Sequence, residues 1–405
     1  MKQNINIIKL NPKDMKKLFT LAPLFVMGWC ALTFVACSDD DKPMPELTDD
    51  DGGALSCVEQ ILDGCNDIAN EVGEAKIGDP LGLYLAGDHA RALYAVESWY
   101  SWRSRQDYSN NILSIRNAYY GSLDGTVATA SLSTLLAGAN TELDKQMRDA
   151  IAVAYNAILA IPDPFCQHIA CEEAEVAQEK CAALCDVIGS VKSYIKRNSA
   201  INTNEVLDPI VANYVDAVVL PTYKTLSANA DVFYTKVQEF VAEPSNATFE
   251  AVAKCWIDAR EPWEESEAFL GFGPVDALGL DPNMDSWPLD QDQIANILTS
   301  GNYDELNWSD DDDDDAIEAA QGVRGFHTLE FLIFKNGKVR TTTDEAEDSS
   351  NANLVWTEQN KTSWGNYMLQ CAKLLKADAN TLYNSWNTSY NGGVSYASLF
   401  KSHNI

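Results

Sequence analysis

The chain has 405 residues and is 46% hydrophobic, enough to bury the core of more than one domain. Its formal net charge of −31 at pH 7 gives an acidic surface that repels nucleic-acid phosphates, so we expect no binding to DNA or RNA. The mean hydropathy of −0.21 excludes a polytopic membrane protein.

Residues 1–36 are predicted to be a secretory signal. Lys16 and Lys17 precede an apolar run over residues 18–35, and a basic start followed by such a run is typical of a signal peptide. The alternative is a single-pass membrane anchor, which usually needs a longer uninterrupted apolar stretch.

The end of this run is similar to the lipobox of bacterial lipoproteins. Ala36 comes just before Cys37, although Phe34 stands where leucine is usual. The predicted lipidated residue is therefore Cys37, and residues 37–53 form an acidic tether similar to the tag of surface-displayed lipoproteins. We expect an outer-membrane lipoprotein, held to the membrane by its lipid and exposed at the cell surface.

Helical periodicity continues from residue 54 to the end of the chain. Apolar residues recur at i, i+3, i+4 and i+7 in seven segments, and no alternating strand pattern is evident. The predicted helices cover residues 56–72, 94–121, 141–161, 172–197, 204–241, 247–270 and 367–386. The fold class is all-α, with two packed four-helix-like bundles. A break near 198–203 divides them into a first domain, 54–199, and a second domain, 200–405.

Four cysteines lie close together in the sequence, at Cys166, Cys171, Cys181 and Cys185. In an exported protein this favours disulfides or buried thiols over a zinc site, because the cluster contains no CxxC pair.

Two segments carry candidate binding residues. In "RGFHTLEFL", Arg324, His327 and Glu330 are three apart and would share a helix face, while Gly325 leaves room for a close approach. The alternative is a purely structural histidine, whose ring forms its hydrogen bond with a neighbouring carboxylate.

In "AREPWEESEAFLGFGP", four residues at i, i+3, i+4 and i+7 form a second stripe: Arg260, Trp263, Glu264 and Glu267. Pro262 predicts a kink or a new helix start within it. Buried charges of this kind need partners.

These two segments resemble the imelysin-like family, with its Gly-x-His-x-x-Glu motif, and the resemblance extends over most of residues 55–400. It implies a two-domain helical lipoprotein or periplasmic protein associated with iron uptake, from a family once classed as metallopeptidases. It also implies which residues form the site: His327, Glu330, Glu264 and Glu267, with Arg260, Trp263, Arg324 and Gly325 beside them.

The order of the segments departs from the family. Residues 56–81 and 97–121 resemble segments that normally follow the motif helix, so we predict a circularly permuted fold. The end of the chain near Phe400 should then lie close to the first helix near Leu55. The permuted segment adds further candidates for the opposite wall of an interdomain cleft: Glu97, Ser98, Ser101, Asp107 and Asn111. Glu97, Ser101 and Ser104 are predicted to share a helical face, which Asp107 and Asn111 continue.

The favoured function is non-enzymatic binding of iron or another divalent or trivalent metal, of haem, or of a small chelate, with an outer-membrane transport partner. Three alternatives stay open. A zinc metallopeptidase would use His327 and Glu330, but no HExxH is present. A di-iron oxidase would need two Glu-x-x-His motifs. The last is a structural or adhesive surface protein.

Overall fold

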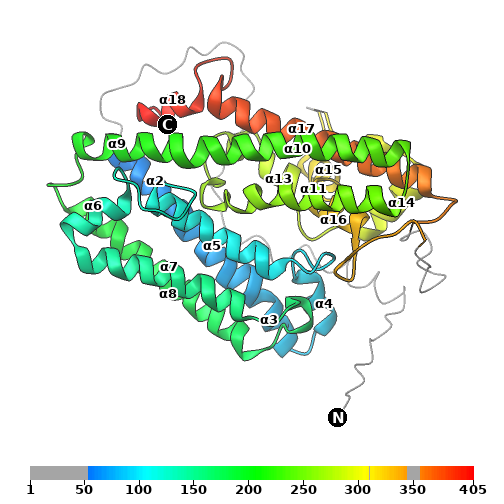
Figure 1. The fold of residues 1–405 in the computed structure, drawn as a ribbon, viewed down its shortest axis with the longest axis horizontal. Coiled ribbons are helices and arrows are strands. Elements are labelled where there is room, and N and C mark those ends of the chain that lie inside the picture. Colours follow the sequence, from blue (N-terminus) through cyan, green and yellow to red (C-terminus); the bar gives the residue numbers. More distant parts are fainter. Residues whose placement is uncertain (1–52, 310, 344–355) are drawn as a thin grey trace. The chain divides into compact units, whose positions relative to one another are not determined.

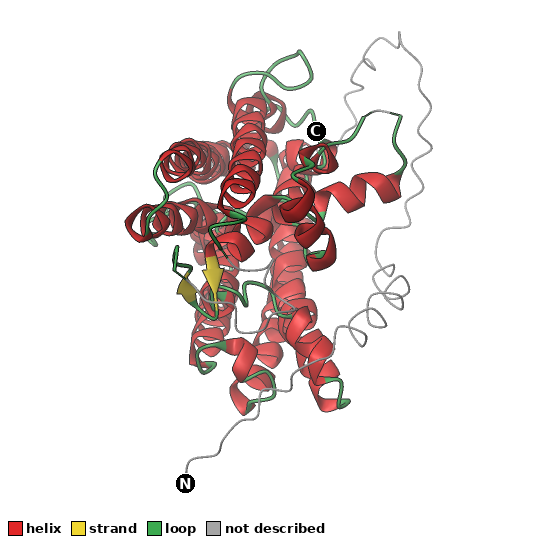
Figure 2. Ribbon diagram, turned by 90° about the vertical axis from the view of Figure 1, so that its right-hand side faces the viewer, coloured by secondary structure: helices red, strands yellow, loops and turns green. Residues whose placement is uncertain are grey.

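The computed structural model describes residues 53–309, 311–343 and 356–405. The predicted signal peptide, Cys37 and nearly all of the predicted tether lie outside these residues. Helices make up nearly all the secondary structure, with one short hairpin (Figure 2). The all-α prediction is therefore confirmed. None of the described helices combines the length and apolar character needed to cross a membrane.

The first half of the described chain contains helices that pack along their apolar faces. Asn140 caps one of them, accepting a hydrogen bond from the Leu143 backbone, and Gly121 ends another with a left-handed φ of 68°. The elements are α2 (Gly53–Asn70), the π-helix η1 (Glu71–Gly78), α3 (Asp79–Leu85), α4 (His89–Ala95), α5 (Ser104–Tyr120), α6 (Leu132–Ala139), α7 (Thr141–Ala160), η2 (Phe165–Gln167) and α8 (Glu172–Arg197). Helix α8 packs against both α7 and α2, and α5 packs against α7 (Figure 1).

The second half is built around one long helix that packs on two others. Figure 1 shows α10 in green beside the orange-red α17, and α10 also packs along α11. The elements up to α14 are α9 (Asn204–Tyr214), η3 (Val215–Val219), α10 (Leu220–Ala242), α11 (Asn246–Glu264), η4 (Glu267–Phe269), α12 (Pro274–Ala277), α13 (Leu280–Asp285) and α14 (Gln291–Ser300). The others are η5 (Tyr303–Leu306), α15 (Asp314–Gln321), α16 (Gly325–Ile333), β1 (Phe334–Lys335), β2 (Lys338–Val339), α17 (Lys361–Asn387) and α18 (Tyr396–Lys401).

Contacts between the two halves place the candidate site. Helix α2 packs against α9 and η4, and α5 packs against α11 and η4. The predicted break is present, because α8 ends at Arg197 and α9 begins at Asn204. The division into domains 54–199 and 200–405 stays a prediction, since the buried apolar side chains of both halves belong to one core.

The last helix lies against the first. The Cys57 thiol in α2 donates a hydrogen bond to the backbone oxygen of Phe400 in α18, over a distance of 3.4 Å. Phe400 is fully buried and stacks on Phe272. The predicted closeness of these two parts of the chain is confirmed, while the permuted order of family segments stays a prediction.

The predicted continuous helix over 94–121 is wrong. Helix α4 ends at Ala95, and α5 begins only at Ser104. Between them Ser98 and Trp102 adopt left-handed φ values of 53° and 61°. A tertiary contact explains the break, since the Trp102 ring packs directly on Gly337 in the hairpin.

The eight cysteines of the described part are free thiols. Of the two expectations for the cysteine cluster, buried or half-buried thiols are the one observed. Burial raises the pKa of the Cys181 thiol to about 12, which makes it a poor nucleophile at neutral pH.

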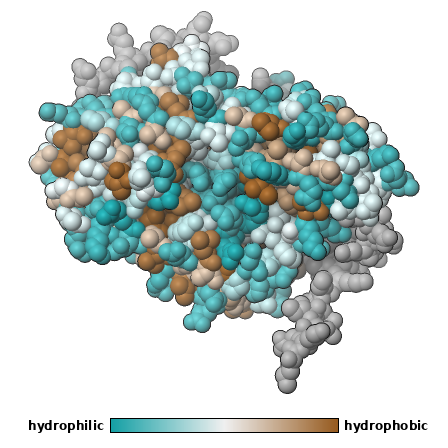
Figure 3. Space-filling view, viewed as in Figure 1, coloured by the Kyte–Doolittle hydropathy of each residue, from teal (hydrophilic) through white to brown (hydrophobic). Residues whose placement is uncertain are grey.

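The visible surface agrees with the acidic composition. In Figure 3 hydrophilic residues cover most of the face, and hydrophobic residues form small separate groups.

Candidate functional site

A fully buried arginine lies where α5, α11 and α13 meet. Nη2 of Arg260 is 2.5 Å from Glu264 Oε1, and Nε is 3.5 Å from Asp107 Oδ2. Nη1 of the same guanidinium contacts Asp285 Oδ1. A buried guanidinium is tolerated only when it is paired in this way. The indole nitrogen of Trp263 donates to the other oxygen of Asp285, at 2.7 Å.

The motif histidine is held between two carboxylates. His327 Nδ1 lies 3.1 Å from Glu330 Oε2, one helical turn further along α16, and Nε2 lies 3.2 Å from Asp285 Oδ1. The second oxygen of Glu330 accepts hydrogen bonds from the backbone and hydroxyl of Ser101, at 2.8 and 2.7 Å. The Trp287 ring lies 4.8 Å from the imidazole. Both ring nitrogens therefore have a carboxylate partner.

This placement predicts a raised pKa for the His327 imidazole. Burial and the neighbouring Arg260 lower the pKa of His327, but Asp285 and Glu330 outweigh them and raise that pKa above the usual 6.5. The stability that protonation confers should be fully present below pH 6.5 and be lost as the pH rises through the raised folded value.

Nitrogen NMR of the four histidines as a function of pH measures this pKa directly. We expect Asp285→Asn to lower the pKa of His327, because the substitution removes the negative charge beside Nε2. A pKa of His327 at or below 6.5 in the unmodified protein would contradict the prediction.

Three carboxylates form a candidate cation-binding site beside this histidine. Glu264, Glu267 and Asp285 each offer an oxygen, and the three oxygens lie within 4.8 Å of one another. Burial raises the pKa of Glu264 to about 8 and that of Glu267 well above its usual value. Although burial opposes it, Arg260 and His327 hold the pKa of Asp285 below its usual value. Glu264 and Glu267 therefore resist ionisation, whereas the charged form of Asp285 is favoured.

An amide reaches the same oxygens from α5. Asn111 Nδ2 donates to Glu264 Oε2 at 2.6 Å, whereas Asn111 Oδ1 is buried without a hydrogen-bond partner. A buried acceptor without a donor is unusual in native proteins and is consistent with a missing ligand atom. We call the residues Asp107, Asn111, Arg260, Glu264, Glu267, Asp285, His327 and Glu330 the acid–histidine cluster.

A buried lysine extends the cluster toward the surface. Lys76 on η1 places its ammonium 3.1 Å from Glu97, 3.5 Å from Glu71 and 3.6 Å from Glu267. Lys76 is 5% exposed, while the Glu71 side chain is 50% exposed. These four residues are called the lysine site, and Glu71 forms its solvent-facing side.

The structure brings most of the predicted site residues together. His327, Glu330, Glu264, Glu267, Arg260, Trp263, Ser101 and Asp107 lie in or against the acid–histidine cluster, and Glu97 lies in the lysine site. Two details differ from the prediction. Glu267 lies beyond the end of α11 and arrives on η4. The predicted helical face of Glu97 and Ser101 is wrong, because residues 96–103 form turns.

Arg324 does not share a face with His327. It precedes α16 as the N-cap in an extended conformation, with φ −140° and ψ −175°. Its guanidinium contacts Asp378 on α17 and the backbone oxygen of Leu306. Arg324 thus anchors the start of α16, while the adjacent Gly325, at φ 81°, allows the backbone to approach Met284.

Three residues of the acid–histidine cluster and the lysine site were missed from the sequence: Asp285, Lys76 and Glu71. Asp285 ends the short helix α13, where nothing in "DPNMDSW" separates it from the chain's many surface aspartates. Lys76 in "EVGEAKIG" resembles an exposed helix lysine. The available signal was the pair of glycines, Gly73 and Gly78, which let η1 pack closely on α8.

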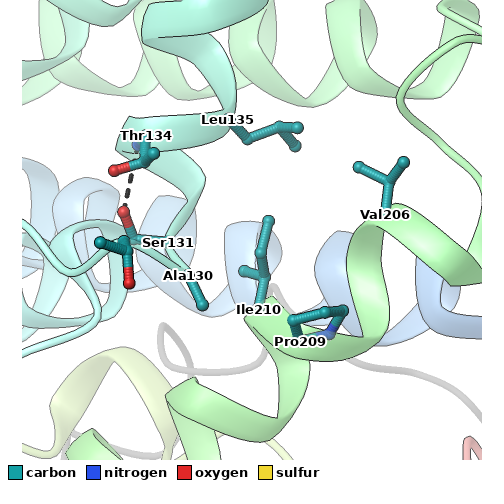
Figure 4. A pocket seen from close by; sticks show the side chains of 8 residues that line it. Ala130, Ser131, Thr134, Leu135, Val206, Pro209 and Ile210 are labelled. Carbon is teal, nitrogen blue, oxygen red and sulfur yellow. Dashed lines mark hydrogen bonds between the residues drawn. The ribbon is translucent and has the colours of Figure 1, made fainter.

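A hollow on the surface lies elsewhere. It has a volume of about 310 Å³, and side chains of α6 and α9 line it, among them Leu135, Val206, Pro209 and Ile210 (Figure 4). None of its lining residues belongs to the acid–histidine cluster or the lysine site.

A family model described as imelysin matches residues 40–191 and 219–404. The chain belongs to the imelysin family. A crystal structure of an imelysin peptidase from Bacteroides ovatus is 59% identical, with a TM-score of 0.70 over 71% of this chain and 82% of that one.

Two further relatives of this imelysin-family chain carry another name. Iron-regulated protein A from Synechococcus elongatus is 29% identical over 151 residues, which are 37% of each chain, so the match spans well under half of that protein. A putative iron-regulated protein A precursor from Parabacteroides distasonis is 32% identical over 50% of this chain and 51% of that one, with a TM-score of 0.43.

Proposed function

We propose that this imelysin-family protein is a non-enzymatic, iron-linked binding protein, anchored to the outer membrane through Cys37 and exposed at the cell surface. Its site is the acid–histidine cluster. The observation that carries the proposal is the group formed by Glu264, Glu267 and Asp285, whose oxygens lie within 4.8 Å of one another. The name iron-regulated protein A, borne by a relative, supports a link to iron.

The donor atoms fit a hard or borderline cation. Carboxylate oxygens with one imidazole nearby suit iron or calcium better than a soft metal, and no described cysteine belongs to the group. The ion would be held by Glu264, Glu267 and Asp285. Arg260 would keep the carboxylates of Glu264 and Asp285 in position. The same guanidinium would donate hydrogen bonds to the carboxylate of a small chelate or to a haem propionate.

The zinc peptidase alternative has less support. A catalytic zinc needs several protein ligands and an open position for water. Both nitrogens of His327 already face carboxylates. The other three histidines lie elsewhere: His89 stacks on Tyr84, His168 contacts the Pro164 carbonyl and His403 contacts Asp208.

Calorimetric titration with ferrous iron, ferric iron, zinc and haem, together with elemental analysis, tests the proposal. We expect an iron species to bind, and Glu267→Gln to weaken that binding by about 100-fold, because a ligand charge is lost while the shape is kept. Glu250→Gln, an exposed residue on α11, is the matched control and should bind as the unmodified protein does.

Absence of iron and haem binding by the unmodified protein would overturn the proposal. Binding that Glu267→Gln leaves unchanged would move the site away from the acid–histidine cluster. Cleavage of peptides that disappears in His327→Ala would instead favour the peptidase.

A further inference from the structure

The lysine site has the geometry of a cation-binding site in which the ammonium of Lys76 takes the place of the cation. One ammonium faces three carboxylates, which come from η1, from the loop before α5 and from η4. Its distances of 3.1 to 3.6 Å exceed the roughly 2.7–2.9 Å of strong charge-assisted hydrogen bonds. Lys76 therefore balances the charge of these oxygens without binding any one of them closely.

The single charge of the Lys76 ammonium does not balance the three carboxylates around it. Lys76 carries one positive charge, whereas three carboxylates lie within 3.6 Å of its ammonium: Glu71, Glu97 and Glu267. Because Glu267 also belongs to the carboxylate group with Glu264 and Asp285, the two sites share one residue. A cation of higher charge at Glu267 would meet Lys76 as its competitor.

A separate observation indicates a missing partner. Tyr108 on α5 is completely buried, and its hydroxyl has no hydrogen-bond partner. Burial raises the pKa of Tyr108, and the charges of Glu97 and Lys76, which lie close to its hydroxyl, raise and lower that pKa respectively. Buried oxygens of this kind normally bind a donor, an ion or water.

The backbone and the exposure provide a way for the lysine to leave. Lys76 lies on an eight-residue π-helix, a rare conformation that is frequently found at functional sites. Glu71, five residues earlier on the same element, is half exposed. The long side chain of Lys76 can therefore extend past Glu71 and place its ammonium in solvent while its backbone stays in place.

We propose that Lys76 is the built-in counter-cation of this site, and that a divalent or trivalent cation binds by displacing its ammonium from Glu267. The inference rests on the proposed function and adds a determinant of affinity and selectivity to it. An ion of single charge gains little by replacing an ammonium, whereas an ion of higher charge gains from every carboxylate. Lys76 thus selects against monovalent ions.

Two measurements with ferrous iron under anaerobic conditions test the inference. In calorimetry, Lys76→Met should bind iron about tenfold more tightly or better, because a competing charge is removed and the chain length is kept. Lys192→Met is the control, since Lys192 pairs with Asp63 on the surface between α8 and α2, and it should bind as the unmodified protein does.

The second measurement uses the unmodified protein and does not depend on the variant folding. Acylation of lysines by an amine-reactive reagent, followed by mass spectrometry, should label Lys76 slowly without iron and faster with it. Lys192 should label equally in both conditions.

The outcomes separate the two proposals. If the unmodified protein binds iron, but Lys76→Met binds no more tightly and iron leaves the labelling of Lys76 unchanged, this inference fails while the proposed function stands. If neither protein binds iron, both fail. Faster labelling with iron supports the inference even where Lys76→Met does not fold.

Discussion

Replacing Arg260 by methionine is expected to lower the free energy of unfolding by about 3–5 kcal/mol. The guanidinium is completely buried and contacts Asp107, Glu264 and Asp285. Methionine fills similar space but leaves these carboxylates buried without their cation. Urea denaturation followed by circular dichroism measures the loss.

The control is a lysine on the same helix. Lys254 is 74% exposed and lies 2.5 Å from Asp258. An exposed pair of this kind contributes little, so Lys254→Met should leave the free energy of unfolding almost unchanged. A loss as small for Arg260→Met would mean that the carboxylates are neutral without it, which would contradict the ionic account of the cluster.

Gly325→Ala is expected to cost about 3 kcal/mol or more, because it combines backbone strain with a steric clash. Gly325 has a φ of 81°, and an added Cβ would lie 2.4 Å from the backbone oxygen of Met284. To relieve this contact α13 would have to move, and with it Asp285. We therefore expect a lower melting temperature, weaker binding of iron and a lower pKa of His327.

Gly322→Ala provides the comparison within the same segment. Gly322 has a φ of −66°, and its nearest neighbour to an added Cβ is the Glu318 oxygen at 3.5 Å. This substitution should leave the melting temperature almost unchanged. Equal effects at both glycines would contradict the close-approach role of Gly325.

The local parts of the fold and of the site were predictable from sequence. The spacing of His327 and Glu330 places them one turn apart on α16, and periodicity locates the long helices and the break between Arg197 and Asn204. These features depend on residues within a few positions of one another. The spacing in residues 260–267 and the imelysin resemblance both indicated Glu264 and Glu267, and both lie in the cluster.

The parts that failed depend on contacts between distant segments. Asp285 is set by the packing of α13 on α16, and Lys76 is set by η1, whose π-helical form no hydrophobic pattern specifies. Trp102 is held in a left-handed conformation against Gly337, which breaks a segment with helical periodicity. Arg324 pairs with Asp378 on α17, and its side chain therefore does not share a helix face with His327. Tertiary packing overrides local preference in each case.

The most direct test of the central claim is a crystal structure after soaking in ferrous iron, with diffraction data recorded at the iron absorption edge. The account predicts an anomalous peak within bonding distance of carboxylate oxygens of Glu264, Glu267 and Asp285, with the Lys76 ammonium moved away from Glu267. A peak elsewhere on the protein, or no peak in a protein that binds iron in solution at one equivalent, would contradict it.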